Sequence, residues 1–214
     1  SSAASDVYKR QTQTPQAPDA DVLLCPPATL LAAMAQQKPD WMTLGGQDCS
    51  PAASGAHTGD ISAAMLADLG CTHVIVGHSE RRSDHHETNG LVRTKAQAAV
   101  EARLIPILCV GETREQRESG DAVSVVTAQM RDSLPEVSAD QIVIAYEPVW
   151  AIGTGLTASP EDAQAMHAAL REAWPGSDGQ ALRILYGGSM NPGNADALLA
   201  QPDIAVSYTH LTLP

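Results

Sequence analysis

Basic residues and long apolar segments are both scarce in this sequence. The chain of 214 residues has 13 Lys and Arg residues against 25 Asp and Glu residues, which gives a formal net charge of -12. Nucleic acid and anionic membrane surfaces would repel such a chain at long range, so neither is an expected partner. No uninterrupted apolar segment approaches the ~20 residues that a membrane-spanning helix needs.

Secretion signals and cysteine pairs are also lacking. The amino-terminal residues do not show the charged region followed by an apolar region that marks a signal peptide, so the cytoplasm is the expected compartment. The four cysteines, which form no CxxC pair, are Cys25, Cys49, Cys71 and Cys109. Because Cys25, Cys71 and Cys109 lie in or beside apolar strand-like runs, we expect buried, reduced thiols.

Short apolar runs alternate with helical segments from Asp21 to Val206. The runs predicted as strands are 22–25, 42–44, 73–76, 105–110, 142–146 and 182–186, and residues 201–206 lead into a last strand. The segments predicted as helices are 29–37, 60–69, 88–102, 122–133, 160–173 and 192–200. This alternation indicates a parallel sheet covered by helices. Periodicity alone does not distinguish an open doubly wound sheet from a closed barrel.

The first residues depart from this pattern. Residues 1–20 are rich in Ser, Thr, Gln and Pro and have almost no apolar periodicity, which predicts a disordered or non-native segment. Residues 21–206 form the predicted domain. A complete (β/α)8 barrel typically needs about 250 residues, so the chain is short for such a barrel.

One stretch places a carboxylate at the end of a buried strand. An apolar run is followed by the sequence AYEPVWAIGTG over residues 145–155. Pro148 fixes φ and stops ladder pairing, while Gly153 and Gly155 permit a close approach of backbone and ligand that a side chain would block. On these residues alone, Glu147 is either a base on a rigid strand end or a carboxylate that faces water.

Two further motifs occur with this stretch. GHSERR spans residues 77–82 and YGGS spans residues 186–189. Together, and in this order, the three motifs resemble those of triosephosphate isomerases, in which AYEPVWAIGTG forms the sixth strand and the lid. The resemblance selects a (β/α)8 TIM barrel. It implies a metal-free, cofactor-independent isomerase of glycolysis and gluconeogenesis that interconverts dihydroxyacetone phosphate and D-glyceraldehyde 3-phosphate.

The same resemblance implies that parts of the barrel are missing. Family members end their first strand with Asn-x-Lys, but Lys9 follows Val7 and Tyr8 and is not assigned the role of that lysine. Residues 207–214 stand where the family has a Gly-Gly phosphate loop and a last helix, so we predict a non-native tail there. We therefore expect a barrel without its first strand and without most of its eighth.

The motif residues take their expected roles from the family. Glu147 is expected to be the catalytic base and His78 a neutral electrophile. In the family, the residue that matches Glu80 supports the catalytic lysine without touching the substrate. The alternative for Glu80 is an ordinary acidic residue in the first turn of a helix. The residues expected to bind the substrate phosphate are Gly153, Gly187, Gly188 and Ser189. The residues expected to form the lid are Pro148, Val149, Trp150, Ala151, Ile152, Thr154 and Gly155.

A long polar loop follows the second predicted strand, over residues 47–59. It resembles the family loop that reaches into a neighbouring subunit, with Thr58 near its tip. A homodimer is what this resemblance implies, and a mobile surface loop is the alternative.

Two other functions stay open at this point. An aldolase or epimerase barrel would need a Schiff-base lysine within a strand or metal ligands at strand ends, and the sequence shows neither. A non-catalytic or inactive truncated barrel that only binds a phosphometabolite is favoured by the missing Asn-x-Lys. The presence of both Glu147 and His78 opposes it, because a binding protein does not need a base beside an electrophile.

Overall fold

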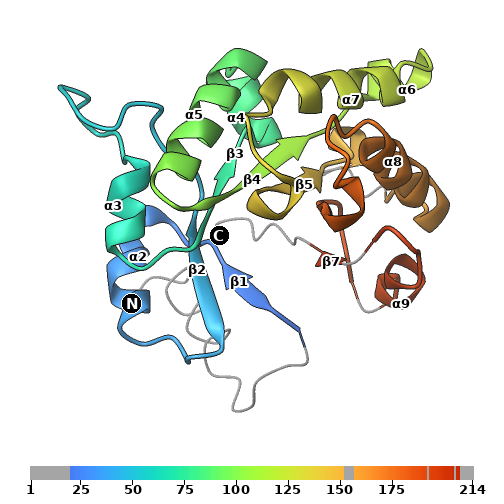
Figure 1. The fold of residues 1–214 in the computed structure, drawn as a ribbon. Helices are drawn as coiled ribbons and strands as arrows, with labels where there is room; N and C mark the ends of the chain where they lie inside the picture. Colours follow the sequence, from blue (N-terminus) through green and yellow to red (C-terminus); the bar gives the residue numbers. More distant parts are fainter. Residues whose placement is uncertain (1–19, 152–156, 192, 205, 208–214) are drawn as a thin grey trace.

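The computed structural model describes residues 20–151, 157–191, 193–204 and 206–207. In these ranges, seven parallel strands lie in chain order in one curled sheet (Figure 1). The strands are β1 Val22–Leu24, β2 Met42–Gly46, β3 His73–Val76, β4 Ile105–Val110, β5 Val143–Tyr146, β6 Arg183–Tyr186 and β7 Val206–Ser207. No ladder between described residues joins β7 back to β1. The sheet is therefore a partial (β/α)8 barrel, as the family resemblance implies.

Helices connect successive strands and cover the outer side of the sheet (Figure 1). They are α2 Ala28–Ala35, α3 Ala63–Asp68, α4 Ser79–Asp84, α5 Asn89–Glu101, α6 Arg114–Glu118, α7 Ala122–Ser133, α8 Pro160–Glu172 and α9 Ala195–Leu199. Short 3-10 helices span Ala139–Gln141, Val149–Ala151 and Gly179–Ala181. No helix in the described ranges combines the length and the hydropathy that crossing a membrane requires.

Alternate residues along the central strands contribute to two different clusters of the core. Val74 and Val76 of β3 belong to a large cluster that includes buried residues of the helices. Ile75, between them, belongs to a second cluster. Its members, such as Ile107 and Val143, lie in the strands or directly beside them in sequence. This second cluster lies on the inner side of the curled sheet. Both faces of the strands are thus covered, which explains their nearly continuous apolar sequences.

The cysteines are free thiols, as expected. Cys49, Cys71 and Cys109 are buried, while Cys25 at the end of β1 is only partly buried. Burial raises the pKa of the Cys49 thiol to about 12. A thiol with such a pKa stays protonated at neutral pH and is a poor nucleophile.

The division of the chain into three segments stays a prediction. Residues 1–19, including Lys9, and residues 208–214 lie outside the described part of the chain. Ser207, the first residue of the predicted tail, belongs to β7 and pairs with Tyr186 of β6.

His167 of α8 is buried against the segment that leads into β7. Its Nδ1 lies 3.0 Å from the Asp203 carbonyl oxygen, to which it donates, and Arg171 Nε lies 2.7 Å from the Asp203 carboxylate. The His167 ring also meets Tyr146 edge-on, with ring centroids 6.0 Å apart. Burial lowers the pKa of His167 to about 4, although the Asp203 carbonyl acts in the opposite direction. The folded chain therefore holds this imidazole neutral.

We expect this histidine to make the folded state less stable in acid. Its pKa is about 4 when folded and about 6.5 when unfolded, so its contribution is complete above pH 6.5 and declines as the pH falls toward 4. The full loss is on the order of 3 kcal/mol. The variant His167→Gln keeps a donor for the Asp203 carbonyl but has no group that titrates.

Urea unfolding of the chain and of His167→Gln at pH values of about 7 and about 4.5 measures this contribution. The unaltered chain is expected to lose more free energy of unfolding between the two pH values than the variant does. Equal losses in the two proteins would contradict the assignment.

Candidate active site

Glu147 and His78 lie at the carboxyl ends of two strands and face each other. Glu147 follows β5, and its backbone N–H donates to the Val110 carbonyl at 2.8 Å, which continues the pairing with β4. His78 follows β3 and is the N-cap of α4. His78 Nε2 lies 2.7 Å from Glu147 Oε1, and Glu147 Oε2 accepts from the Ser79 backbone N–H at 3.0 Å. The side chains are buried, with exposed fractions of 8% for His78 and 1% for Glu147.

Both ring nitrogens of His78 have a partner. Nδ1 accepts from the Glu80 backbone N–H at 3.3 Å, so the proton of a neutral ring lies on Nε2, next to Glu147. Burial lowers the pKa of His78, but the hydrogen bond and the charge of Glu147, together with a smaller effect of the Glu80 charge, raise it above its ordinary value. The Glu80 N–H favours the neutral ring. The charge on His78 therefore depends on whether Glu147 stays in contact with it.

The Glu80 carboxylate itself is exposed. Its Oε2 lies 3.7 Å from His78 Nδ1, and the exposed fraction of its side chain is 58%. It sits in the first turn of α4, which was the alternative expectation for this residue. Its supporting role stays a prediction.

Gly111 and Gly187 pack closely against Glu147, where a larger residue would not fit. A Cβ atom at Gly111, after β4, would lie 1.9 Å from the Glu147 carbonyl oxygen. A Cβ atom at Gly187, after β6, would lie 3.1 Å from Glu147 Cγ and 3.0 Å from the Tyr146 carbonyl oxygen. A side chain at Gly111 would force the segment that carries Glu147 to move, and one at Gly187 would crowd it.

The first residues of the expected lid lead away from Glu147. Pro148 is buried and is followed by the 3-10 helix Val149–Ala151. Trp150 Nε1 donates to Glu112 Oε1 at 2.9 Å. The other expected lid residues, Ile152, Thr154 and Gly155, lie outside the described residues, and so does Gly153.

Glu112 is a residue of this region that the sequence analysis did not identify. Its side chain is fully buried, and Oε1 accepts from the Tyr146 hydroxyl at 3.0 Å as well as from Trp150. Arg117 Nη1 lies 3.3 Å from the same oxygen, and the Arg117 guanidinium lies over the Trp150 ring, 4.7 Å from its centroid. The available signal was its position two residues beyond an apolar strand, as in the case of His78.

The residues expected to hold the phosphate follow β6, next to Glu147. Gly187 and Gly188 are buried and Ser189 is exposed. The Gly187 N–H donates to the Tyr146 carbonyl at 2.7 Å, so this amide is already engaged. The Ser189 carbonyl accepts from Asn194 Nδ2 at 3.0 Å, which fixes the turn before α9. Phosphate binding by these residues stays a prediction.

Among the residues that the structure describes, neither a metal site nor a lysine accompanies His78 and Glu147. No group of three or more His, Cys, Asp and Glu side chains there could hold a metal ion. Lys95 of α5 is bound to Asp48 and Glu87, and Lys38 follows α2, on the way to the opposite end of the strands.

Comparisons with known proteins agree with the motifs and the geometry. The family model described as triosephosphate isomerase matches residues 1–205. Triosephosphate isomerase of Acidiphilium cryptum is 53% identical over 202 residues, which cover 89% of this chain and 80% of the relative. Triosephosphate isomerase of Ruegeria pomeroyi is 49% identical over 208 residues, which cover 94% of this chain and 83% of the relative.

A solved structure supports the same assignment. The crystal structure of triosephosphate isomerase from Bartonella henselae matches with a TM-score of 0.80 and 43% identity, covering 86% of this chain and 78% of that one. These relatives share about half of their residues with this chain over most of its length. The partial barrel and the His78–Glu147 contact agree with membership of the same family. This chain therefore belongs to the triosephosphate isomerase family of aldose–ketose isomerases.

Proposed function

We propose that Glu147 and His78 together interconvert dihydroxyacetone phosphate and D-glyceraldehyde 3-phosphate in this chain. The supporting observation is the 2.7 Å distance between His78 Nε2 and Glu147 Oε1, which joins a base to a hydrogen-bond donor in a buried site. Interconversion requires removal of a proton from the carbon next to a carbonyl and its return to the adjacent carbon. A single carboxylate can carry out both transfers.

The substrate takes the place of the direct contact between the two side chains. Glu147 Oε1 then faces the substrate carbon and removes its proton. The electron pair of the C–H bond forms the carbon–carbon double bond of the enediolate, and the π electrons of the carbonyl move onto its oxygen. His78 Nε2–H donates a hydrogen bond to that oxygen, where negative charge develops in the enediolate. Glu147 then returns the proton to the neighbouring carbon. The proton of the substrate hydroxyl moves to the former carbonyl oxygen, relayed by His78 Nε2, and this transfer completes the reaction.

The protonation state of His78 follows from its partners. While Glu147 contacts Nε2, its charge raises the pKa of His78. Once the substrate separates the two side chains, this effect weakens and the Glu80 N–H at Nδ1 favours the neutral ring. A neutral ring with its proton on Nε2 is the form that polarises a carbonyl and can pass a proton between the two substrate oxygens.

A coupled assay for conversion of D-glyceraldehyde 3-phosphate into dihydroxyacetone phosphate tests this proposal. Turnover by the purified chain supports it. A chain that has a folded circular dichroism spectrum and binds a phosphate analogue without turning over the substrate supports the alternative, a non-catalytic barrel. The cytoplasm as the site of this reaction also stays a prediction.

The loop between β2 and α3 supports the proposal of a homodimer. It projects from the barrel (Figure 1), and residues 53–60 are exposed. Its base is held by Ser50, whose backbone N–H donates to Ile61 at 2.8 Å and whose hydroxyl donates to Asp60 at 2.9 Å. A projecting loop that is fixed at its base suits insertion into a second copy, since less conformational entropy is lost on binding. Triosephosphate isomerases are typically dimers, which supports the same reading.

We expect the chain to sediment as a dimer at micromolar concentration and Thr58→Asp to shift it toward the monomer. A carboxylate introduced at the loop tip has to be desolvated when the loop enters a partner. Thr94→Asp, on the exposed side of α5, is the matched control and is expected to leave the dimer intact. A purely monomeric unaltered chain would contradict the dimer.

A further inference from the structure

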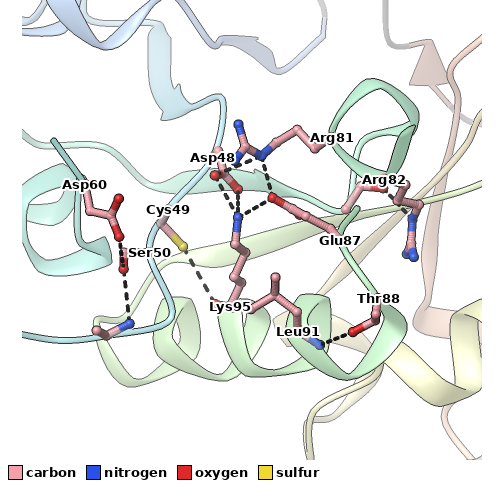
Figure 2. Close-up of polar contacts among 12 residues, drawn as sticks. Asp48, Cys49, Ser50, Asp60, Arg81, Arg82, Glu87, Thr88, Leu91 and Lys95 are labelled. Atoms are coloured by element: carbon pink, nitrogen blue, oxygen red, sulfur yellow. Dashed lines mark hydrogen bonds and ion pairs between the residues drawn. The ribbon is translucent and has the colours of Figure 1, made fainter. Parts of the chain in front are cut away.

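Arg82 connects β3, which leads to His78, with β4, the neighbour of the strand that leads to Glu147. It lies in α4, and Figure 2 shows its side chain pointing away from the charged cluster that Arg81 enters. Its Nε donates to the Gly77 carbonyl at 2.8 Å, directly before His78. Its Nη2 donates to the Cys109 carbonyl of β4 at 3.2 Å. One planar group thus contacts the carboxyl ends of two neighbouring strands.

Two further bonds fix the guanidinium from the helix side. Nη1 donates to Asn89 Oδ1 at 2.8 Å at the start of α5, and Nη2 lies 3.4 Å from Ser133 Oγ at the end of α7. All four of these acceptors are neutral oxygens. An ion pair that holds a helix to its neighbour would have a carboxylate partner instead. The Arg82 guanidinium binds two backbone carbonyls. Its rigid, planar set of N–H donors suits this task better than the single ammonium group of a lysine.

The contact between Arg82 and the Gly77 carbonyl lies at the turn that sets the direction of the chain toward His78. The φ of Gly77, +68°, lies in the left-handed region, so the chain turns sharply between β3 and His78. A Cβ atom at Gly77 would lie 2.9 Å from Arg82 Nη2 and 2.7 Å from Val92 Cγ1. The turn is therefore packed directly against the guanidinium, and the carbonyl of Gly77 is held by it.

Cys109 connects the same group to Glu147. Its neighbour Val110 accepts the Glu147 backbone N–H at 2.8 Å, so the position of β4 sets the position of Glu147. We propose that Arg82 is a positioning residue that sets the separation of His78 and Glu147 by holding the ends of β3 and β4. This inference rests on the proposed roles of those two residues.

The test compares Arg82→Lys with Arg81→Lys. Lysine at position 82 keeps the charge but cannot hold both carbonyls, while Arg81, one residue earlier in α4, contacts Asp48 and Glu87 and serves as the matched control. For Arg82→Lys we expect kcat to fall on the order of 10- to 100-fold and KM to change less than about threefold, because a small misplacement of reacting groups affects the chemical step. For Arg81→Lys we expect both constants to stay within about twofold of the unaltered chain.

A second readout needs no turnover. Contact with Glu147 raises the pKa of His78. An NMR titration of the chain without substrate can follow this pKa. We expect Arg82→Lys to move this pKa back toward the ordinary histidine value and Arg81→Lys to leave it unchanged. Failure of the proposed reaction would remove the kinetic difference but not the difference in titration.

Asn89→Ala provides a milder variant if Arg82→Lys does not fold. It removes one acceptor of the guanidinium and leaves the charge in place, and a smaller shift of the same two readouts is expected. The inference is overturned if the Arg82 variant, or Asn89→Ala in its place, melts earlier while kcat, KM and the pKa of His78 stay as in the unaltered chain. Such a result would mean that Arg82 only stabilises the fold.

Discussion

Replacing Glu147 with glutamine is expected to lower kcat for the isomerisation of D-glyceraldehyde 3-phosphate by about 10²- to 10⁴-fold. Glutamine has nearly the same shape, and its amide oxygen can still accept from the Ser79 N–H, which lies 3.0 Å from Glu147 Oε2. The amide cannot take up a proton at neutral pH. The fold is thus expected to stay, while the proton transfer is lost.

Glu118→Gln is the control for this substitution. It makes the same chemical change on an exposed residue at the end of α6 and is expected to leave kcat within about twofold. KM is expected to change little in Glu147→Gln, because the carboxylate acts on the substrate chiefly in the transition state. A kcat equal to that of the unaltered chain would show that another group is the base.

The largest expected effect on stability at neutral pH comes from a partly buried charged cluster around Lys95, in the middle of α5. Lys95 Nζ lies 2.8 Å from both Asp48 carboxylate oxygens and 2.6 Å from Glu87 Oε1. Arg81 Nε lies 2.9 Å from Asp48 and 2.7 Å from Glu87, so two cations bind two carboxylates (Figure 2). Although burial alone would raise it, hydrogen bonds from Lys95 and Arg81 hold the pKa of Glu87 below its ordinary value.

Lys95→Met is expected to lower the free energy of unfolding by about 3 kcal/mol, because it leaves Glu87 buried with only one of its two cations. Lys95 is 4% exposed and Glu87 is 6% exposed, so water does not replace the lost partner. Methionine fills most of the space of the lysine stem, which limits the effect of an added cavity. Urea or thermal unfolding at neutral pH measures the change.

The double variant Lys95→Met/Glu87→Gln is the control for this account. It removes the unpaired charge together with the cation, so it is expected to recover a substantial part of the lost stability. A loss of less than about 1 kcal/mol in Lys95→Met would contradict the view that this cluster depends on its lysine, and would place it with ordinary surface pairs.

The order of strands and helices was predictable because the central strands, such as β4 and β5, are buried on both faces. Runs such as Ile105–Val110 are therefore apolar throughout, and they stand out between helices with a single apolar side. The short helix α6 was not predicted, although Thr113 and Gln116 carry the capping-box spacing. Curling of the sheet does not follow from periodicity, since the strands of an open parallel sheet and those of a barrel both bury residues on two faces.

The two central site residues were predicted from motifs, but their neighbours were not. His78 and Glu147 lie in long motifs, whereas Arg82 is one of two consecutive arginines and nothing in the sequence separates it from Arg81. The burial of Lys95 was not predicted either, because a lysine in a helix is normally exposed. Only the fold shows that it meets Asp48, a residue from a distant loop. Contacts of this kind depend on tertiary structure.

The most direct test of the central claim is kcat for four proteins: the chain, Glu147→Gln, His78→Gln and the double variant. If the two residues act on one proton transfer, each single change is expected to lower kcat strongly, and the double variant is expected to be little slower than the slower single one. A double loss equal to the product of the single losses would mean that the residues act independently. Unchanged kcat in either single variant would remove that residue from the reaction.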